Sequence, residues 1–80
     1  MEKRFGAAVI LVENKEHIDA MNHLLSVYSD LIIARQGLRD KGVSIITVIL
    51  EGTSDQINSL TGKLGRLEGV QVKSVLTTYK

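Results

Sequence analysis

The sequence has no cysteine, no proline and no tryptophan among its 80 residues. The absence of cysteine excludes disulfides and metal sites made of thiolates. It also indicates a reducing, cytoplasmic setting, because small secreted domains are often rich in disulfides. The absence of proline removes the strongest helix breaker but identifies no function. Aromatic residues are few, and Phe5 and Tyr79 fall near the ends of predicted strands, so the stacking platform of an RNA-recognition sheet is not expected.

Excess charge and long apolar runs are missing as well. The formal net charge is +1, which argues against direct nucleic-acid binding by this chain alone. No apolar run approaches the ~20 residues of a membrane-spanning helix, so no membrane association is expected. The basic start and the apolar stretch 5–12 resemble a signal peptide. A charged segment follows that stretch at once, so a first strand is the better interpretation.

Hydrophobic periodicity predicts four strands, at residues 4–12, 30–36, 43–51 and 70–78. A first helix is expected from the cap residue Asn14 to about Tyr28. A second helix follows Thr53, whose spacing to Gln56 fits a capping box. Gly69 is a natural left-handed stop after this second helix. Residues 37–42, which are bounded by glycines, are predicted as the turn between the two middle strands.

The order of these elements, β-α-β-β-α-β, predicts a single ferredoxin-like domain of the α+β class over residues 1–80. Right-handed crossovers place both helices on one face of a four-stranded antiparallel sheet. The first and third strands then lie in the centre of the sheet, and the second and fourth strands form its edges.

Three strand segments are apolar at nearly every position, namely 5–12, 31–34 and 43–50. Such continuous runs are typical of strands that are buried on both faces. Two helices can cover only one face of the sheet, so we expect a second copy of the chain to cover the other. Burial of each large aliphatic side chain contributes ~1.5–3 kcal/mol, which is ample to drive a homodimer or homotetramer. A small sheet with an exposed apolar face is the alternative.

No arrangement of side chains points to catalysis or to a metal ion. The two histidines, His17 and His23, are six positions apart, which on a helix separates them by about 120° and prevents them from binding one ion within a subunit. The carboxylates stand at strand ends, turns and helix surfaces instead of converging in a pocket. We therefore expect no catalytic residue, no metal site and no cofactor.

Two loops are the best candidates for binding a small effector, because each precedes a helix whose free N–H groups attract anions. One loop follows the first strand and the other follows the third strand, and we expect both at the same end of the sheet. Helix capping without a ligand is the competing interpretation. The candidate residues are Glu13, Asn14, Lys15, Glu51, Gly52, Thr53 and Ser54.

Four further residues are candidates for subunit contact or close approach. Gly62 and Gly65 lie inside the second predicted helix, where each costs about 1 kcal/mol relative to alanine. Both are opposite the apolar stripe, so they indicate either a closely approaching backbone or ligand, or a tolerated weakness of the helix. Arg35 and Arg39 make the hairpin locally basic, which fits either a phosphate contact or a solvated turn.

Gly37 and the runs 40–46, 50–53, 60–65 and 69–74 resemble the family of iron-only hydrogenase system regulators. The resemblance implies a ferredoxin-like domain similar to ACT domains and to the C-terminal domain of the nickel-responsive repressor. Those relatives are oligomers that bind small effectors or metal between subunits. The repressor's strand histidines and cysteine have no counterpart here, so nickel is not expected. Its N-terminal DNA-binding segment has none either, so a regulator of this kind would act through a partner.

The resemblance and the apolar sheet together predict a non-catalytic regulatory module that binds a small effector at or near an oligomer interface. A protein-docking or assembly module without a ligand is the alternative, because the edge strands could pair with a partner's strand. An acylphosphatase-like enzyme shares this topology but needs an arginine in the loop after the first strand, where residues 13–15 provide none.

Overall fold

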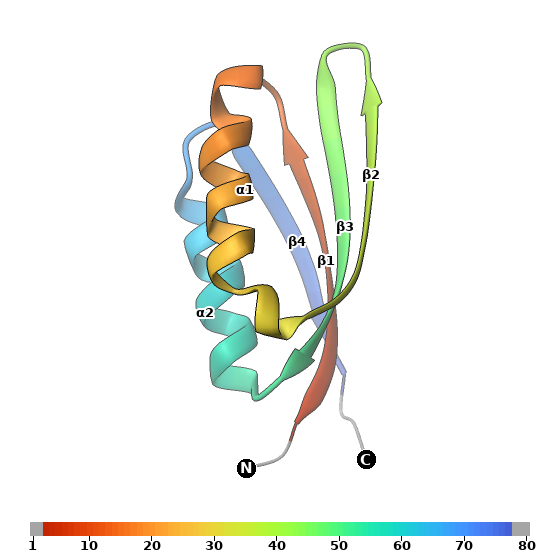
Figure 1. Ribbon diagram of the computed structural model, residues 1–80, viewed down its shortest axis with the longest axis vertical. Coiled ribbons are helices and arrows are strands. Elements are labelled where there is room, and N and C mark those ends of the chain that lie inside the picture. Colours follow the sequence, from red (N-terminus) through yellow and green to blue (C-terminus); the bar gives the residue numbers. More distant parts are fainter. Residues whose placement is uncertain (1–2, 78–80) are drawn as a thin grey trace.

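A computed structural model describes residues 3–77 of the chain (Figure 1). The strands are β1 (Arg4–Val12), β2 (Ile32–Asp40), β3 (Val43–Gly52) and β4 (Val70–Leu76). The helices are α1 (Ile18–Val27) and α2 (Ser54–Arg66). Short 3-10 turns precede and follow α1, namely η1 (Lys15–His17) and η2 (Ser29–Leu31). The predicted order of strands and helices is confirmed.

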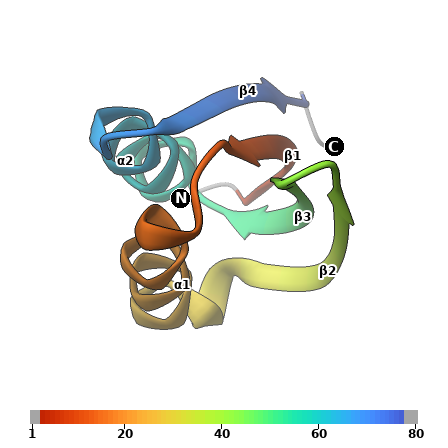
Figure 2. The same cartoon turned by 90° about the horizontal axis from the view of Figure 1, so that it is seen from above.

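The four strands form one antiparallel sheet in the order β2-β3-β1-β4. Both helices lie on the same side of this sheet, with α1 beside β2 and α2 beside β4 (Figure 2). The central positions of β1 and β3 and the edge positions of β2 and β4 are as predicted. The architecture is that of an α+β ferredoxin-like domain. No helix within residues 3–77 is long and apolar enough to cross a membrane.

The core lies between the helices and the sheet face that they cover. Alternate side chains of the central strands enter this core, and Ile10, Val48 and Leu50 are completely buried there. The apolar stripe of α2 packs against them through Leu60 and Leu64, which are also completely buried. One face of the sheet is therefore sealed by residues of the chain itself.

The second helix begins at its predicted cap residue, whereas α1 begins at Ile18 after His17 and has no side-chain cap. The side chain of Asn14 accepts a hydrogen bond from the backbone N–H of Glu16, and Asn14 caps η1, which leads into α1. Thr53 and Gln56 form a complete capping box at the start of α2, with hydrogen bonds of 3.2 and 2.9 Å. After α2, Gly69 has a φ of 76°, which is the left-handed conformation predicted for a residue that ends a helix.

The predicted turn over residues 37–42 is wrong, because β2 continues through Gly37 to Asp40. The reversal takes only Lys41 and Gly42, whose φ angles are 53° and 82°. Two consecutive left-handed residues form the tight two-residue turn whose twist suits a β-hairpin. Because the turn is so short, β2 extends to Asp40 and β3 begins at Val43. The last two residues of β2 are polar, so no apolar alternation marks this end of the strand.

The prediction that residues 31–34 are buried on both faces is also wrong. Leu31 is buried, but it belongs to η2, and β2 is exposed from Ile33 onward. The strand is an edge of the sheet, and a bulge between Ile32 and Ala34 shifts its register against β3. β4 is described to Leu76, and residue 78 of the predicted strand lies outside the described residues.

Candidate functional site

The two predicted effector loops lie at opposite ends of the sheet, which corrects the expectation that they share one end. β1 and β3 are antiparallel, and Val12 at the end of β1 pairs with Ser44 near the start of β3. Gly52 at the end of β3 pairs with Arg4 at the start of β1. A loop that follows β1 and a loop that follows β3 must therefore leave the sheet in opposite directions.

The loop after β1 uses its polar groups within the fold. The carboxylate of Glu13 accepts a hydrogen bond of 2.9 Å from the side chain of Gln71 on β4. The backbone N–H of Glu13 donates to the carbonyl of Gly69, and the side chain of Asn14 caps the following turn. Lys15 is exposed beside them. These contacts join β1 to β4 and start the helical segment, as the capping interpretation requires.

The loop after β3 is closed in the same way. Thr53 and Gln56 satisfy each other's backbone N–H groups in the capping box. A side chain at Gly52 would place its Cβ 2.9 Å from both the Gln56 amide oxygen and a Leu31 methyl group, so the ends of those two side chains would have to move to admit it. Glu51 and Ser54 are partly exposed on either side.

The sheet face opposite the helices carries exposed apolar side chains from all four strands, together with the polar residues Asp40, Gln71 and Lys73 at the edge strands. We call it the open face. It includes Val9 at 47% exposure, Leu38 at 63% and Val75 at 67%. Seven further apolar side chains point away from the helices in the strand registers and belong to the open face. Ala34 and Ile49 are exposed, and the other five are partly buried, namely Phe5, Ala7, Leu11, Val43 and Ile45.

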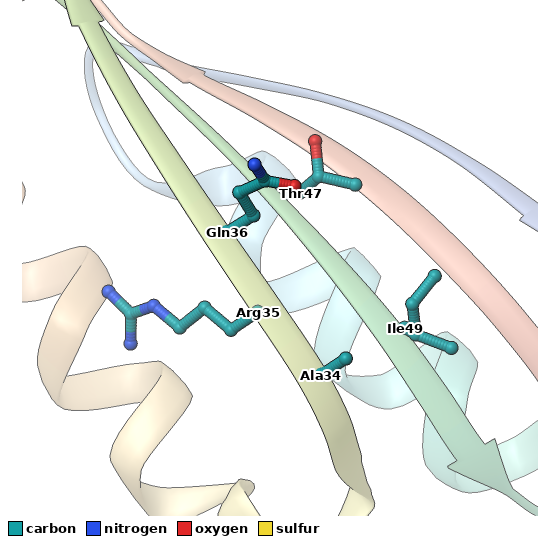
Figure 3. A pocket seen from close by; sticks show the side chains of 5 residues that line it. All are labelled: Ala34, Arg35, Gln36, Thr47 and Ile49. Atoms are coloured by element: carbon teal, nitrogen blue, oxygen red, sulfur yellow. The ribbon is translucent and has the colours of Figure 1, made fainter.

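Two adjoining hollows of about 180 and 270 Å³ lie on the open face along β2 and β3. Gln36 and Thr47 line both hollows and are partners in the strand register. Figure 3 shows their side chains close together, with Ala34 and Ile49 farther along the strands. Leu38 and Ile45 line the second hollow. An amide and a hydroxyl thus stand in the middle of an apolar trough.

Arg35 and Arg39 lie on the other face of β2, because they alternate with Gln36 and Leu38. The guanidinium of Arg35 turns toward α1 (Figure 3) and donates a 2.7 Å hydrogen bond to the side chain of Asn22. Gly37 separates the two arginines on this face. The sequence predicted Arg35 near the end of a strand and Arg39 in the following turn, whereas the structure places both on one side of an exposed edge strand.

Gly62 and Gly65 face open space, since no atom lies within 4 Å of a Cβ built at either position. Within residues 3–77, no backbone outside the helix itself approaches them. Beside them, the hydroxyl groups of Tyr28 and Ser59 are hydrogen-bonded at 3.0 Å. The Lys63 ammonium lies 5.3 Å from the centre of the Tyr28 ring. Interaction with Lys63 and then with Ser59 lowers the pKa of the exposed Tyr28 phenol below its ordinary value of 10.0.

The described residues contain no group of three histidine or acidic side chains that could hold a metal ion. His17 belongs to η1, where its ring lies against Gly69 and leaves no room for a Cβ at that glycine. His23 is an exposed residue of α1. The ring of His17 thus takes part in packing between η1 and the loop before β4.

The sequence matches the TM1266-like family over residues 4–74, and this family is provisionally described as an iron-only hydrogenase system regulator. The chain belongs to this family. The uncharacterised protein TM1266 from Thermotoga maritima is similar in structure, with a TM-score of 0.91 and 38% sequence identity. That comparison covers 96% of this chain and 100% of the other. No curated protein matches the sequence.

More distant structures share the fold alone. The ACT domain of GTP pyrophosphokinase from Chlorobium tepidum has a TM-score of 0.79 at 17% identity, over 92% of this chain and 100% of that one. The C-terminal domain of the MgtC protein from Mycobacterium tuberculosis has a TM-score of 0.72 at 9% identity, over 95% and 89% of the two chains. The predicted family and the predicted ACT-like fold are both confirmed.

Sequence reasoning missed Gln36 and Thr47, the two polar residues at the centre of the open face. Gln36 was taken as the last residue of a strand, and Thr47 lies in a run of aliphatic residues on β3. The available signal was Thr47 itself, because it is the one polar residue between Ile45 and Leu50. A hydroxyl at a position that is otherwise aliphatic indicates a polar requirement there.

Proposed function

We propose that the protein is a non-catalytic regulatory module of an iron-only hydrogenase system. In this proposal it assembles with further copies of itself through the open face and binds a small effector beside that contact. The family supports the regulatory role, and the ACT-like fold supports a domain without catalysis. The observation that carries the proposal is the open face itself.

The open face is too apolar for a surface that remains in water. Val9, Ile49 and Val75 are each more than one third exposed, and they belong to a contiguous surface on three strands. Large contiguous apolar surfaces are uncommon on soluble monomers and mark interaction sites. The described chain has no further element that could cover this face, since both helices lie on the other side (Figure 2). A second copy would supply a matching apolar surface.

The hollows over Gln36 and Thr47 are the place that best suits an effector. They lie on the open face, so a second copy packed there would enclose them. A small molecule with an apolar body and a hydrogen-bonding group would match their aliphatic walls and central amide and hydroxyl. The loops at residues 13–15 and 51–54 remain weaker candidates, because capping and packing already use many of their polar groups.

The assembly can be tested by measuring the mass in solution by light scattering at low micromolar concentration. We expect a dimer or tetramer for the unchanged protein. Val9→Asp should weaken the contact, because the open face would have to bury a carboxylate, whose loss of water is costly even with Lys73 as its cross-strand neighbour. Val27→Asp is the matched control, since Val27 is an exposed valine of α1. An unchanged protein that is a monomer would contradict the proposal.

The effector can be sought by thermal unfolding of the protein with amino acids, nucleotides and divalent metals. A ligand at 100 times its dissociation constant should add about 2.7 kcal/mol to the free energy of unfolding. Thr47→Val should abolish that gain for a ligand bound in the trough while conserving the shape of the side chain. An oligomer whose stability no compound raises would favour the docking module without a ligand.

A further inference from the structure

Four neighbouring side chains, one from each strand, form a row across the middle of the open face. In the strand registers, Gln36 lies beside Thr47, Thr47 beside Val9, and Val9 beside Lys73. We call these four residues the middle row. Three of them are polar, and none of those three side chains has a hydrogen-bond or ion-pair partner within residues 3–77. The middle row therefore holds an amide, a hydroxyl and an ammonium group that the described part of the subunit leaves unpartnered.

The acidic residues of the open face lie at its two ends. Asp40 lies four residues beyond Gln36 on β2, and Glu51 lies four residues beyond Thr47 on β3. Each is therefore about 13 Å along the strand from the middle row. Glu13 follows β1, and its carboxylate already accepts a hydrogen bond from β4. Within residues 3–77, the cation of the middle row has no carboxylate of its own subunit beside it.

Symmetry limits how two open faces can meet. Two sheets that pack face to face keep their strands within about 30° of each other, so a two-fold axis between them runs nearly along the strands or nearly across them. With the strand order β2-β3-β1-β4, an axis along the strands places β2 over the partner's β4 and β3 over the partner's β1. This axis permits no sliding along the strands, so the middle rows of the two copies face each other.

The axis along the strands matches large side chains with small ones. Next to the middle row, the registers place Ala34, Ile49, Ala7 and Val75 side by side. Val75, which is 67% exposed, then lies over the partner's Ala34, beside the smaller hollow of the open face. Ile49 lies over the partner's Ala7 in the same way. Each projecting side chain thus meets a position where the facing residue is an alanine.

An axis across the strands fits less well. It places each strand over the same strand of the partner, and full overlap of the two sheets then brings Lys73 over the partner's Lys73. Like charges that face each other in a contact destabilise it. The axis along the strands instead brings Lys73 over the partner's Gln36, at the opposite edge of the sheet. Charge and side-chain size therefore both favour the axis along the strands.

We propose that two copies pack face to face with β2 over the partner's β4, and that each trough then binds a small aliphatic carboxylate between Gln36, Thr47 and the partner's Lys73. This inference rests on the proposed function, because it specifies how the open faces meet and which class of effector the trough takes. The symmetry creates two identical sites in each pair of subunits, and neither site is complete in one copy.

The partner's Lys73 decides the charge of the ligand. The contact places its ammonium over the amide and the hydroxyl of the trough and removes water from it. A charged group that loses water needs an opposite charge and hydrogen bonds in exchange. A ligand carboxylate would supply the charge, and it would accept hydrogen bonds from the ammonium, from the Thr47 hydroxyl and from the Gln36 amide.

The walls of the trough decide the rest of the ligand. Leu38 and Ile45 line the hollow of about 270 Å³ that adjoins Gln36 and Thr47. These walls are aliphatic, so they favour a short hydrocarbon chain over a second charged group. An amino acid would bring its own ammonium close to the partner's Lys73, where like charges repel. The ligand is therefore a carboxylate without an amino group.

Carboxylate binding and assembly must then strengthen each other. Without the ligand, the contact buries an ammonium that lacks an opposite charge, and this weakens the pair. With the ligand, the same ammonium holds the two subunits to one carboxylate. Because the complete site exists only in the assembled state, the carboxylate favours assembly by mass action. The assembly state of the protein would thus report the concentration of the carboxylate.

The arrangement of the two copies is tested by cross-linking cysteine variants, because the chain has no cysteine of its own. Gln36→Cys and Lys73→Cys proteins are prepared separately and treated with bismaleimidoethane, a short linker between thiols, each alone and then as a mixture. The proposed axis places position 36 of one copy over position 73 of the other. Two copies of the same position lie at opposite edges, three strand spacings or about 14 Å apart across the sheet. A covalent dimer should therefore form only in the mixture.

The other outcomes of this experiment separate the inference from the proposed function. Covalent dimers of each variant by itself would reveal an axis across the strands, which overturns the inference and leaves the open-face contact in place. An oligomer that yields no cross-link in the mixture would also overturn the inference. An unchanged protein that is monomeric in light scattering would contradict the proposed function itself.

The class of ligand is tested with isovalerate, compared at equal ionic strength with its uncharged amide, isovaleramide, and with acetate. Isovaleramide keeps the hydrocarbon chain without the charge, and acetate keeps the charge without the chain. We expect isovalerate to lower the dissociation constant of the pair about tenfold in light scattering on dilution, and the other two to change it much less. An equal effect of all three compounds, or no effect of isovalerate, would overturn the carboxylate site.

The role of the lysine is tested by Lys73→Met, which removes the charge and changes the shape of the side chain little. Without any ligand, this variant should associate about tenfold more tightly than the unchanged protein, because no ammonium is buried. It should also lose the response to isovalerate. Lys63→Met is the matched control, since Lys63 belongs to α2 on the other side of the sheet, and it should retain the response. A response that Lys73→Met also retains would overturn the site.

Discussion

The two faces of the sheet have nearly the same apolar content, but the side chains of one face are buried and many of those on the other are exposed. On β3, Val48 and Leu50 point to the helices and are completely buried, while Ile49 between them is 39% exposed. On β1, Ile10 is buried and Val9 beside it is largely exposed. Neighbouring aliphatic residues thus differ in burial because successive side chains of a strand point to opposite faces of the sheet. The helices of the chain cover one face, and they leave the other face exposed.

The two faces should contribute to the free energy of unfolding in different ways. Contacts on the helix side belong to a single subunit, so their contribution to the free energy of unfolding does not depend on protein concentration. In the proposed assembly, contacts on the open face would form between subunits, so their contribution to the free energy of unfolding would rise with protein concentration. Substitutions on the two faces should therefore be told apart by repeating the same unfolding experiment at different concentrations.

The largest expected effect comes from neighbours on β3. Leu50→Ala removes a completely buried side chain and should lower the free energy of unfolding by about 2–5 kcal/mol at every concentration. Ile49→Ala should have a smaller effect that grows with protein concentration. Urea unfolding at 1 and 100 μM, roughly spanning the range of association, measures both. An effect of Ile49→Ala that is independent of concentration would show that the open face makes no subunit contact.

The sequence predicted the sealed face better than the open one. The apolar stripe of α2, the capping box at Thr53 and the stop at Gly69 are local patterns with one physical meaning, and all three are confirmed. The trough around Gln36 and Thr47 depends on which strands pair and in what register. That information is spread over two strands and a turn, so no local pattern contains it.

The end of β2 is a second feature that the sequence did not predict. Arg39 and Asp40 are polar residues in a strand that is exposed on both faces, so no apolar alternation marks them. Lys41 and Gly42 both adopt positive φ, and only Gly42 signals this in the sequence. For the same reason the sequence predicted Arg39 in a turn and did not predict that Arg35 and Arg39 share one face of an edge strand.

The next effect compares two glycines of the helical layer. Gly69→Ala should lower the free energy of unfolding by about 1–2 kcal/mol or more, because a left-handed φ is unfavourable for alanine and its Cβ would meet the ring of His17. Gly62→Ala should raise it by about 1 kcal/mol, since its Cβ meets no atom and alanine favours the helix. Thermal unfolding of both variants measures the contrast. A loss of stability for Gly62→Ala would reveal a close approach at that glycine between subunits.

A smaller effect is expected from the two helix caps. Thr53→Ala removes half of a complete capping box and should cost about 1 kcal/mol. Asn14→Ala should cost less, since its single capping hydrogen bond is 3.4 Å long and exposed. Both losses belong to one subunit, so they should be equal at low and high protein concentration in urea unfolding. A loss for Thr53→Ala that depends on concentration would connect the start of α2 to a subunit contact.

The smallest effect is expected at Tyr28, whose hydroxyl bonds Ser59 on the outer surface of the helices. Tyr28→Phe should leave the melting temperature at pH 7 nearly unchanged, because the hydroxyl makes an exposed hydrogen bond. Lys63 and Ser59 lower the folded pKa of Tyr28 below 10.0. The folded state therefore releases this proton first as the pH rises, and the unchanged protein gains stability relative to the variant. That gain is complete above the unfolded pKa and disappears as the pH falls through the folded pKa. Melting curves of the two proteins at pH 7 and pH 10 test the sign, and a difference that shrinks toward pH 10 would contradict the role of Lys63.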